Sequence, residues 1–206
     1  MSTWPIQRSE TGAGMTESES IYIDFYETSW GTGAVLFSEA GIKYLLLPTG
    51  DREVLEETLR EEYGECGMIF SGGPARLKEG LLRYFRGEKV EFGRLGLGLD
   101  LSGFSDFEKK ALGIASRIPY GSIWSYKQIA QEIGRPASCR AVGNVMAKNR
   151  VPILVPCHRV VRSDLRIGGF GAGPEWKRRL LELEGIAISS DGKCLLQKKN
   201  VCSAVF

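Results

Sequence analysis

The chain lacks the residues from which most metal sites are built. Its 206 residues include one histidine, His158, and five cysteines, no two of which are separated by just two residues. A zinc site of the usual cysteine and histidine spacing cannot be assembled from this set, so we expect no metal. An odd number of cysteines also argues against a disulfide framework, with a bond between Cys194 and Cys202 left open.

Long apolar runs are absent as well. No stretch approaches the roughly 20 apolar residues that a membrane-spanning helix requires. Residues 1–20 are polar and acidic, unlike a secretory signal, and we expect them to be a disordered lead-in. The prediction is an intracellular protein without a membrane partner, located in the cytoplasm, or in the nucleus if the source is a eukaryote.

The two halves of the chain carry opposite charge. Residues 1–100 hold 10 Lys and Arg against 17 Asp and Glu, whereas residues 101–206 hold 17 against 8. Between Arg117 and Arg179 basic residues outnumber acidic ones by 12 to 3. Such asymmetry indicates that the basic half meets a polyanion. A solvated basic surface is the alternative explanation.

Residues 21–100 are predicted to form an acidic α/β domain with an antiparallel sheet. Stretches that alternate apolar and polar residues indicate strands, with Gly41 in a hairpin turn. In the first helix Val54, Leu55 and Leu59 are expected to form the inward stripe. The predicted strands are 21–28, 34–38, 42–47 and 90–92, and the predicted helices are 51–63 and 74–85. We find no chemical constellation in this half.

Residues 101–187 are predicted to form a second, mostly helical domain, so that the fold class is α+β. Two helices begin with a capping box, in which side chain and backbone bond reciprocally. These boxes are Ser105 with Glu108 and Ser125 with Gln128. The predicted helices are 105–118, 126–133, 138–148 and 174–184. The second and third of these helices, separated by a Gly/Pro turn, are predicted to form a helix-turn-helix. Residues 188–206 are predicted to form a tail or a short hairpin.

The second helix of this predicted helix-turn-helix has two different faces. Val142, Val145 and Met146 are spaced three and four residues apart as an inward stripe. The other face carries one long cation and short side chains: Arg140, Gly143, Asn144 and Ala147. Short side chains let a helix approach DNA closely, and few of these can read bases, which favours contact without sequence specificity. Ordinary helix packing is the alternative.

Cys157 and His158 place a nucleophile next to a titratable base. A free thiol has a pKa of about 8.5, so useful nucleophilicity at neutral pH needs a base or a positive environment. Neighbouring side chains on a strand point to opposite faces, so direct contact of the pair requires a turn or helix start. Pro152 and Pro156 favour such an irregular backbone. A buried, inert cysteine is the commoner reading of a Cys-His pair alone.

Several motifs together resemble one known family. They are Ile118-Pro119-Tyr120-Gly121, Ser125-Tyr126, Arg140-Ala141-Val142-Gly143 and Pro152-Ile153-Leu154-Val155-Pro156-Cys157-His158-Arg159-Val160. In order and spacing they closely resemble the O6-alkylguanine-DNA alkyltransferases, also called methylated-DNA–protein-cysteine S-methyltransferases, over about residues 105–185. The Pro-Cys-His-Arg core is highly specific. The acidic first half matches that family's variable N-terminal domain only by position and element pattern.

The resemblance implies a set of catalytic roles. The residue matching Cys157 attacks the alkyl carbon in line, and the one matching His158 takes the thiol proton through a water. Glu184 falls where the family's glutamate orients that histidine. Tyr126 matches the tyrosine that crowds the flipped nucleotide's phosphate and donates a proton toward N3 of the guanine. Asn149 matches the asparagine that links the recognition helix to the active-site strand.

The resemblance also implies a DNA-binding face and a substrate pocket. Arg140 resembles the family's arginine finger, which fills the gap left by the extruded nucleotide while its helix lies in the minor groove. The residues expected to contact DNA are Arg140, Tyr126, Lys127, Gly143, Ala147 and Ser163. Those expected to line the pocket are Met146, Pro152, Val160, Phe170 and Gly171. The Gly171 amide would face the guanine O6, and the carbonyls of Cys157 and Val160 its exocyclic amine.

The function implied is direct-reversal DNA repair by a suicide enzyme. The alkyl group of O6-alkylguanine in double-stranded DNA would move irreversibly to Cys157, once per chain, in a monomer without a cofactor. O4-alkylthymine stays open as a further substrate, and Phe170, where many members carry tyrosine, bears on the preference among alkyl groups. The alternatives are a non-catalytic protein that flags alkylated bases for other repair, and a cysteine hydrolase that uses Cys157 and His158.

Overall fold

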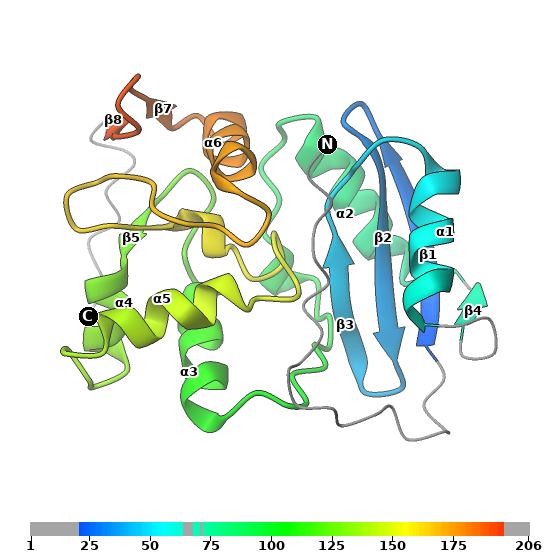
Figure 1. Ribbon diagram of the computed structural model, residues 1–206, viewed down its shortest axis with the longest axis horizontal. Coiled ribbons are helices and arrows are strands. Elements are labelled where there is room, and N and C mark those ends of the chain that lie inside the picture. Colours follow the sequence, from blue (N-terminus) through cyan, green and yellow to red (C-terminus); the bar gives the residue numbers. More distant parts are fainter. Residues whose placement is uncertain (1–20, 64–67, 71, 196–206) are drawn as a thin grey trace. The chain divides into compact units, whose positions relative to one another are not determined.

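The computed structural model describes residues 21–63, 68–70 and 72–195, and the chain divides into two compact units between Leu101 and Ser102. In Figure 1 the first unit runs from blue to teal and the second from green to red. The predicted lead-in at 1–20 lies outside the described residues. None of the helices in the described ranges is long and apolar enough to cross a membrane.

The first unit is built on a four-stranded sheet in the order β3-β2-β1-β4. Its elements are β1 (Ile21–Thr28), β2 (Gly31–Ser38), β3 (Gly41–Leu46), α1 (Arg52–Tyr63), β4 (Met68–Phe70), α2 (Ala75–Phe85) and the short 3-10 helix η2 (Phe92–Arg94). The first three strands form the predicted antiparallel meander, and β4 adds an unpredicted parallel strand beside β1.

The two helices cover opposite faces of this sheet (Figure 1). Leu55 and Leu59 of α1 pack in one cluster with Phe25 of β1. The next residue of β1, Tyr26, points to the other face, where its ring stacks on Phe85 of α2. The core of the unit is therefore divided between the two sides of the sheet.

Two predictions for this unit are wrong. Residues 90–92 form no strand, and Phe92 instead begins η2. Val54 is 63% exposed and so lies off the inward stripe of α1. Successive helical residues are rotated by about 100°, which aligns Leu55 with Leu59 and turns Val54 toward solvent.

The second unit is mostly helical, as predicted. Its elements are α3 (Asp106–Ala115), β5 (Trp124–Ser125), α4 (Tyr126–Glu132), α5 (Cys139–Ala147), the 3-10 turn η3 (Cys157–Arg159), β6 (Val160–Val161), α6 (Pro174–Leu183), β7 (Ala187–Ile188) and β8 (Cys194–Leu195). Strands β5 and β6 pair in parallel, and β7 and β8 form a short antiparallel hairpin. Cys194 carries a free thiol, and Cys202 lies outside the described residues.

Both predicted capping boxes are present. At the start of α3 the hydroxyl of Ser105 accepts from the amide of Glu108, whose carboxylate accepts from the Ser105 amide at 2.9 Å. At the start of α4 Ser125 and Gln128 bond in the same way. Each box satisfies backbone amides that a helix start leaves without partners, and so fixes where the helix begins.

Ser105→Ala should lower the free energy of unfolding by about 1 kcal/mol, because it removes a helix cap. Ser190→Ala, at an exposed position outside any helix, is the matched control and should change the free energy by less than about 0.5 kcal/mol. Denaturant unfolding of both variants measures the difference. Equal losses in the two variants would contradict the capping role.

Candidate active site

The predicted nucleophile lies on a buried, irregular turn. Residues 151–161 are all buried. Directly after Pro156, Cys157–Arg159 form η3, which is one turn of 3-10 helix. Earlier in the segment Ile153 has a φ of 71°, a left-handed conformation that β-branched residues rarely adopt. The 3-10 turn removes the alternation of a strand, so Cys157 and His158 are no longer forced to opposite faces.

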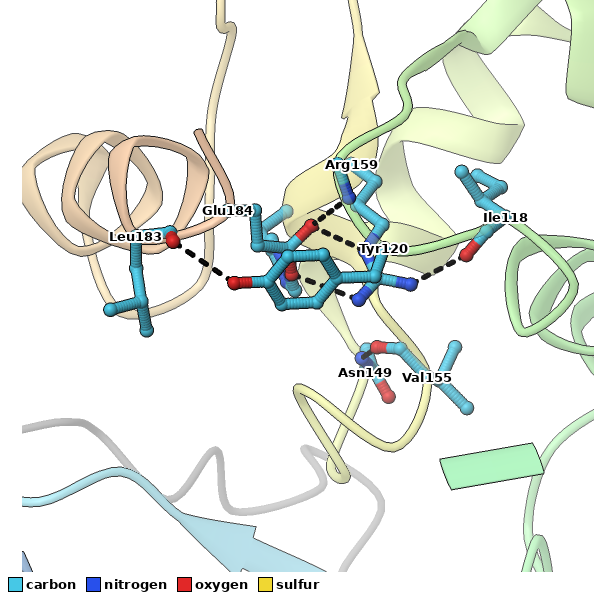
Figure 2. Close-up of polar contacts among 9 residues, drawn as sticks. Ile118, Tyr120, Asn149, Val155, Arg159, Leu183 and Glu184 are labelled. Carbon is cyan, nitrogen blue, oxygen red and sulfur yellow. Dashed lines mark hydrogen bonds and ion pairs between the residues drawn. The ribbon is translucent and has the colours of Figure 1, made fainter. Parts of the chain in front are cut away.

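Asn149 connects the end of α5 to this turn. Its side-chain nitrogen donates to the carbonyl of Val155 at 2.8 Å and to Sγ of Cys157 at 2.9 Å. Its side-chain oxygen accepts from the amide of Val151 at 3.1 Å. Figure 2 shows Asn149 directed at Val155. The thiol is thus held by the segment that follows the predicted DNA-facing helix.

A carboxylate buried behind the turn is the second part of the site. Oε1 of Glu184 lies 2.7 Å from Nε2 of His158, and both side chains are fully buried. Arg159 donates to both carboxylate oxygens, at 2.8 and 2.9 Å, and also to the carbonyl of Ile118 (Figure 2). The amide of Gly121 donates to Oε2 at 3.0 Å, from a residue whose φ of 72° suits glycine.

These contacts decide which groups are charged. Burial alone would raise the pKa of Glu184, but the charges and hydrogen bonds of His158 and Arg159 outweigh it and hold that pKa at about 2. Burial lowers the pKa of His158 against the pull of Glu184. At neutral pH the carboxylate is therefore ionised and the imidazole neutral. The ring then donates from Nε2 to Glu184, which makes Nδ1 its basic nitrogen.

The thiol and the phenol of the site both rest in their protonated forms. Burial raises the pKa of Cys157, against the hydrogen bond from Asn149 and the charge of Lys177. Burial, and then the proximity of Cys157, raise the pKa of Tyr126 to about 12. Cys157 is only 3% exposed, so its thiol has little contact with solvent.

A lysine of α6 joins the strands and loops around the thiol. Lys177 is fully buried, and its Nζ donates to the carbonyls of Val160 at 2.6 Å and Gly169 at 3.2 Å. It also donates to the hydroxyl of Tyr126 at 3.4 Å. Burial lowers its pKa to about 8, against the attraction of Cys157. Lys177 thus connects three segments that carry predicted site residues.

The predicted catalytic residues are gathered in one place. Asn149 bonds Cys157, Glu184 bonds His158, and Tyr126 reaches the same region through Lys177. In the described residues no three His, Cys, Asp or Glu side chains form a candidate metal site. The arrangement brings together a thiol, a neutral imidazole and a protonated phenol.

The predicted DNA-facing residues lie mostly at the surface. Four are exposed and Gly143 and Tyr126 are half-buried; the exposed ones are Lys127, Arg140, Ala147 and Ser163. The predicted inward stripe of α5 is confirmed: Val142, Val145 and Met146 are buried.

The predicted pocket residues are partly enclosed. Met146, Pro152 and Val160 are buried, whereas Phe170 and Gly171 are half-buried. The carbonyl of Val160, assigned by resemblance to the guanine amine, already accepts from Lys177. A second donor would have to use its other lone pair.

Two buried cations of this site were not predicted. Arg159 stands inside the Pro-Cys-His-Arg motif, but nothing local shows that it pairs with a residue 25 positions away. Lys177 was hidden among the charges of α6, although a helical signal was available. Positions 177, 180, 181 and 184 follow the three-and-four spacing of an inward stripe, and all four are buried.

Comparisons with known proteins agree on one family. The family model described as 6-O-methylguanine DNA methyltransferase, DNA binding domain, matches residues 106–186. A methylated-DNA–protein-cysteine methyltransferase of Methanopyrus kandleri is 48% identical over 109 residues, which are 53% of this chain and 79% of that protein. This chain belongs to the methylated-DNA–protein-cysteine methyltransferase family. A Mycobacterium tuberculosis methyltransferase of the same name is 43% identical over 56% of this chain and 65% of its own length.

Solved structures of this methyltransferase family extend the likeness beyond the matched domain. The crystal structure of Mycobacterium tuberculosis O6-methylguanine methyltransferase has a TM-score of 0.64 at 31% identity, over 81% of this chain and 93% of that one. The enzyme of Pyrococcus kodakaraensis has a TM-score of 0.58 at 27% identity, over 81% and 99%. The M. tuberculosis protein has also been solved in complex with DNA, with a TM-score of 0.62 at 30% identity over 80% and 93%. The α+β fold class is therefore confirmed.

Lys177 makes stability depend on pH in a predictable direction. Its folded pKa of about 8 lies below the ordinary 10.5, so between these values the unfolded chain binds more protons. The stability of the natural chain relative to Lys177→Met should therefore rise from pH 8 to pH 10, by about 2 kcal/mol. Denaturant unfolding at several pH values measures this difference. Lys109→Met, at an exposed position of α3, is the control, and a pH-independent difference for Lys177→Met would contradict the assignment.

Proposed function

We propose that this protein repairs DNA by moving the alkyl group of O6-alkylguanine irreversibly to its own Cys157. The observation that carries the proposal is the buried turn on which Cys157 and His158 follow each other, with Asn149 bonded to the thiol and Glu184 to the imidazole. Family membership supports the same reaction, because the relatives are named for transfer to a protein cysteine.

The transfer is a substitution in which a sulfur–carbon bond replaces a carbon–oxygen bond. Nδ1 of His158 takes the thiol proton, directly or through a water, as Sγ of Cys157 attacks the alkyl carbon in line. The bond between that carbon and guanine O6 breaks, and its electron pair stays with the guanine. Tyr126 donates its proton toward N3, so that neutral guanine leaves. Because the thiol pKa is raised and the imidazole pKa lowered, the proton moves only as the new bond forms.

The product explains why each chain reacts once. A thioether has no good leaving group. Of the other thiols in the described residues, Cys139 donates to the carbonyl of Pro136, and Cys194 packs in a hydrophobic cluster with Leu181 and Ile186. The nucleophile, the base, the phenol and the DNA-facing arginine all belong to one unit of one chain, which supports action as a monomer.

DNA would be bound through the exposed face of α5. The short side chains there allow close approach, and Arg140 would occupy the space left by an extruded nucleotide, an extrusion that costs a few kcal/mol. Because Cys157 is buried, entry of the base must also displace side chains of the pocket wall. Attack on O4-alkylthymine would follow the same chemistry. A competition experiment with O6-alkylguanine and O4-alkylthymine in DNA would show which of the two substrates transfers its alkyl group faster.

Incubation with double-stranded DNA carrying radiolabelled O6-methylguanine should transfer one label per chain. Cys157→Ala should transfer none, because the attacking sulfur is gone. Cys194→Ala, which removes another buried thiol of the same unit, should retain full labelling. Labelled Cys157→Ala, or an unlabelled natural chain that binds the DNA tightly, would contradict the reaction. The second result would favour the non-catalytic alternative, and repeated turnover of an ester would favour a hydrolase.

Arg140→Ala should slow transfer from double-stranded DNA by about tenfold or more, because the extruded state loses its filler. Transfer from the free base O6-benzylguanine needs no extrusion and should change by less than about twofold. Single-turnover rates with both substrates measure the contrast. Equal losses on the two substrates would show that Arg140 acts on the fold or the chemistry instead.

A further inference from the structure

Arg159 is a buried cation of the second unit with a partner for each part of its guanidinium. It is 4% exposed, and its Nε and one terminal nitrogen each donate to a different oxygen of Glu184. Its other terminal nitrogen donates to the carbonyl of Ile118, and its guanidinium lies 5.8 Å from the ring centre of Tyr120 (Figure 2). A planar fork that holds both carboxylate oxygens fixes orientation as well as charge.

The same carboxylate holds His158, so Arg159 and His158 share one buried anion. An ionised carboxylate that faced the imidazole alone would strongly favour the protonated ring. A ring protonated before the reaction could not accept the thiol proton. The guanidinium opposes this by balancing the negative charge, while it leaves the hydrogen bond between Glu184 and Nε2 in place.

We infer that Arg159 is a positioning residue for alkyl transfer: it holds and neutralises Glu184, so that Glu184 orients the ring of His158 while the ring stays neutral and able to accept a proton. The inference rests on the proposed function in its use of His158 as the base. It adds a third member, Arg159, to the His158–Glu184 pair.

Three charged groups act on His158 from the elements packed around it. Glu184 and Lys177 come from the end of α6 and from α6 itself, and Arg159 comes from η3. The phenol of Tyr120, in the segment after α3, lies near Glu184 and Arg159 and donates to the carbonyl of Leu183. Burial lowers the pKa of His158 most, and Arg159 and Lys177 lower it further, whereas Glu184 raises it.

The chain offers an unusually direct test, because His158 is its only histidine. The carbon-bound protons and the nitrogen-15 shifts of one imidazole therefore report its titration and tautomer without overlap. In the natural protein we expect the Nε2–H tautomer and a titration midpoint below the ordinary value. In Arg159→Met the midpoint should rise by about one pH unit or more, because Glu184 loses its compensating charge. In Arg159→Lys, which keeps the charge, it should stay near that of the natural protein.

The rate of benzyl transfer from O6-benzylguanine should follow the same titration. In Arg159→Met the acid limb of the pH–rate profile should move to higher pH by as much as the titration midpoint of His158 moves, and the rate should recover at higher pH. In Arg159→Lys the acid limb should return to its natural position. A merely structural role would lower the rate equally at every pH. Arg179→Met, at an exposed position of α6, is the matched control and should leave both midpoints unchanged.

Glu184→Gln keeps the test decisive if Arg159→Met fails to fold. This variant removes the negative charge of residue 184 and leaves the positive charge of Arg159. The titration midpoint of His158 should therefore fall rather than rise. An unchanged or raised midpoint in Glu184→Gln, or an unchanged midpoint in folded Arg159→Met, would overturn the inference. The titration of the imidazole needs no substrate, so it tests the effect of Arg159 on the charge of the ring independently of alkyl transfer. A natural chain that transfers no alkyl group would refute the proposed function and leave this titration test intact.

Discussion

The second unit depends on the burial of one ionised carboxylate. Glu184 follows α6, yet its donors come from the segment after α3 and from the turn η3. A buried charge that loses one partner is strongly destabilising, so these segments are held in a fixed relation. The same requirement that keeps the unit folded also sets the position of His158. Stability and reactivity therefore rest on the same contacts.

Charge is balanced before the reaction and separated only during it. Arg159 offsets Glu184, His158 is neutral, and Cys157 and Tyr126 keep their protons. A dry site of this kind holds little unbalanced charge at rest, apart from Lys177, whose pKa of about 8 leaves it mostly charged at neutral pH. In the proposed reaction, proton movement coupled to bond formation avoids a buried thiolate and a buried anionic leaving group.

Local signals predicted the elements of the fold well and their long-range pairing poorly. Both capping boxes formed where Ser105 and Ser125 predicted them, because caps involve residues three positions apart. The parallel pairing of β4 with β1 joins residues almost 50 positions apart, and three residues of strand carry no distinctive pattern. The error at Val54 arose from grouping by apolarity rather than by helical angle.

The sequence alone was enough to predict the chemistry proposed for this protein: the predicted nucleophile Cys157, its neighbour His158, and the family that their motif resembles. The contacts that surround these groups became visible only in the folded chain. In the sequence nothing local sets Arg159 apart, and the helical spacing of Lys177 indicates that it faces inward but not what it binds. Folding buries these two cations against Glu184 and the carbonyl of Val160. Partner choice is a long-range property, set by which segments pack together, and no local pattern encodes it.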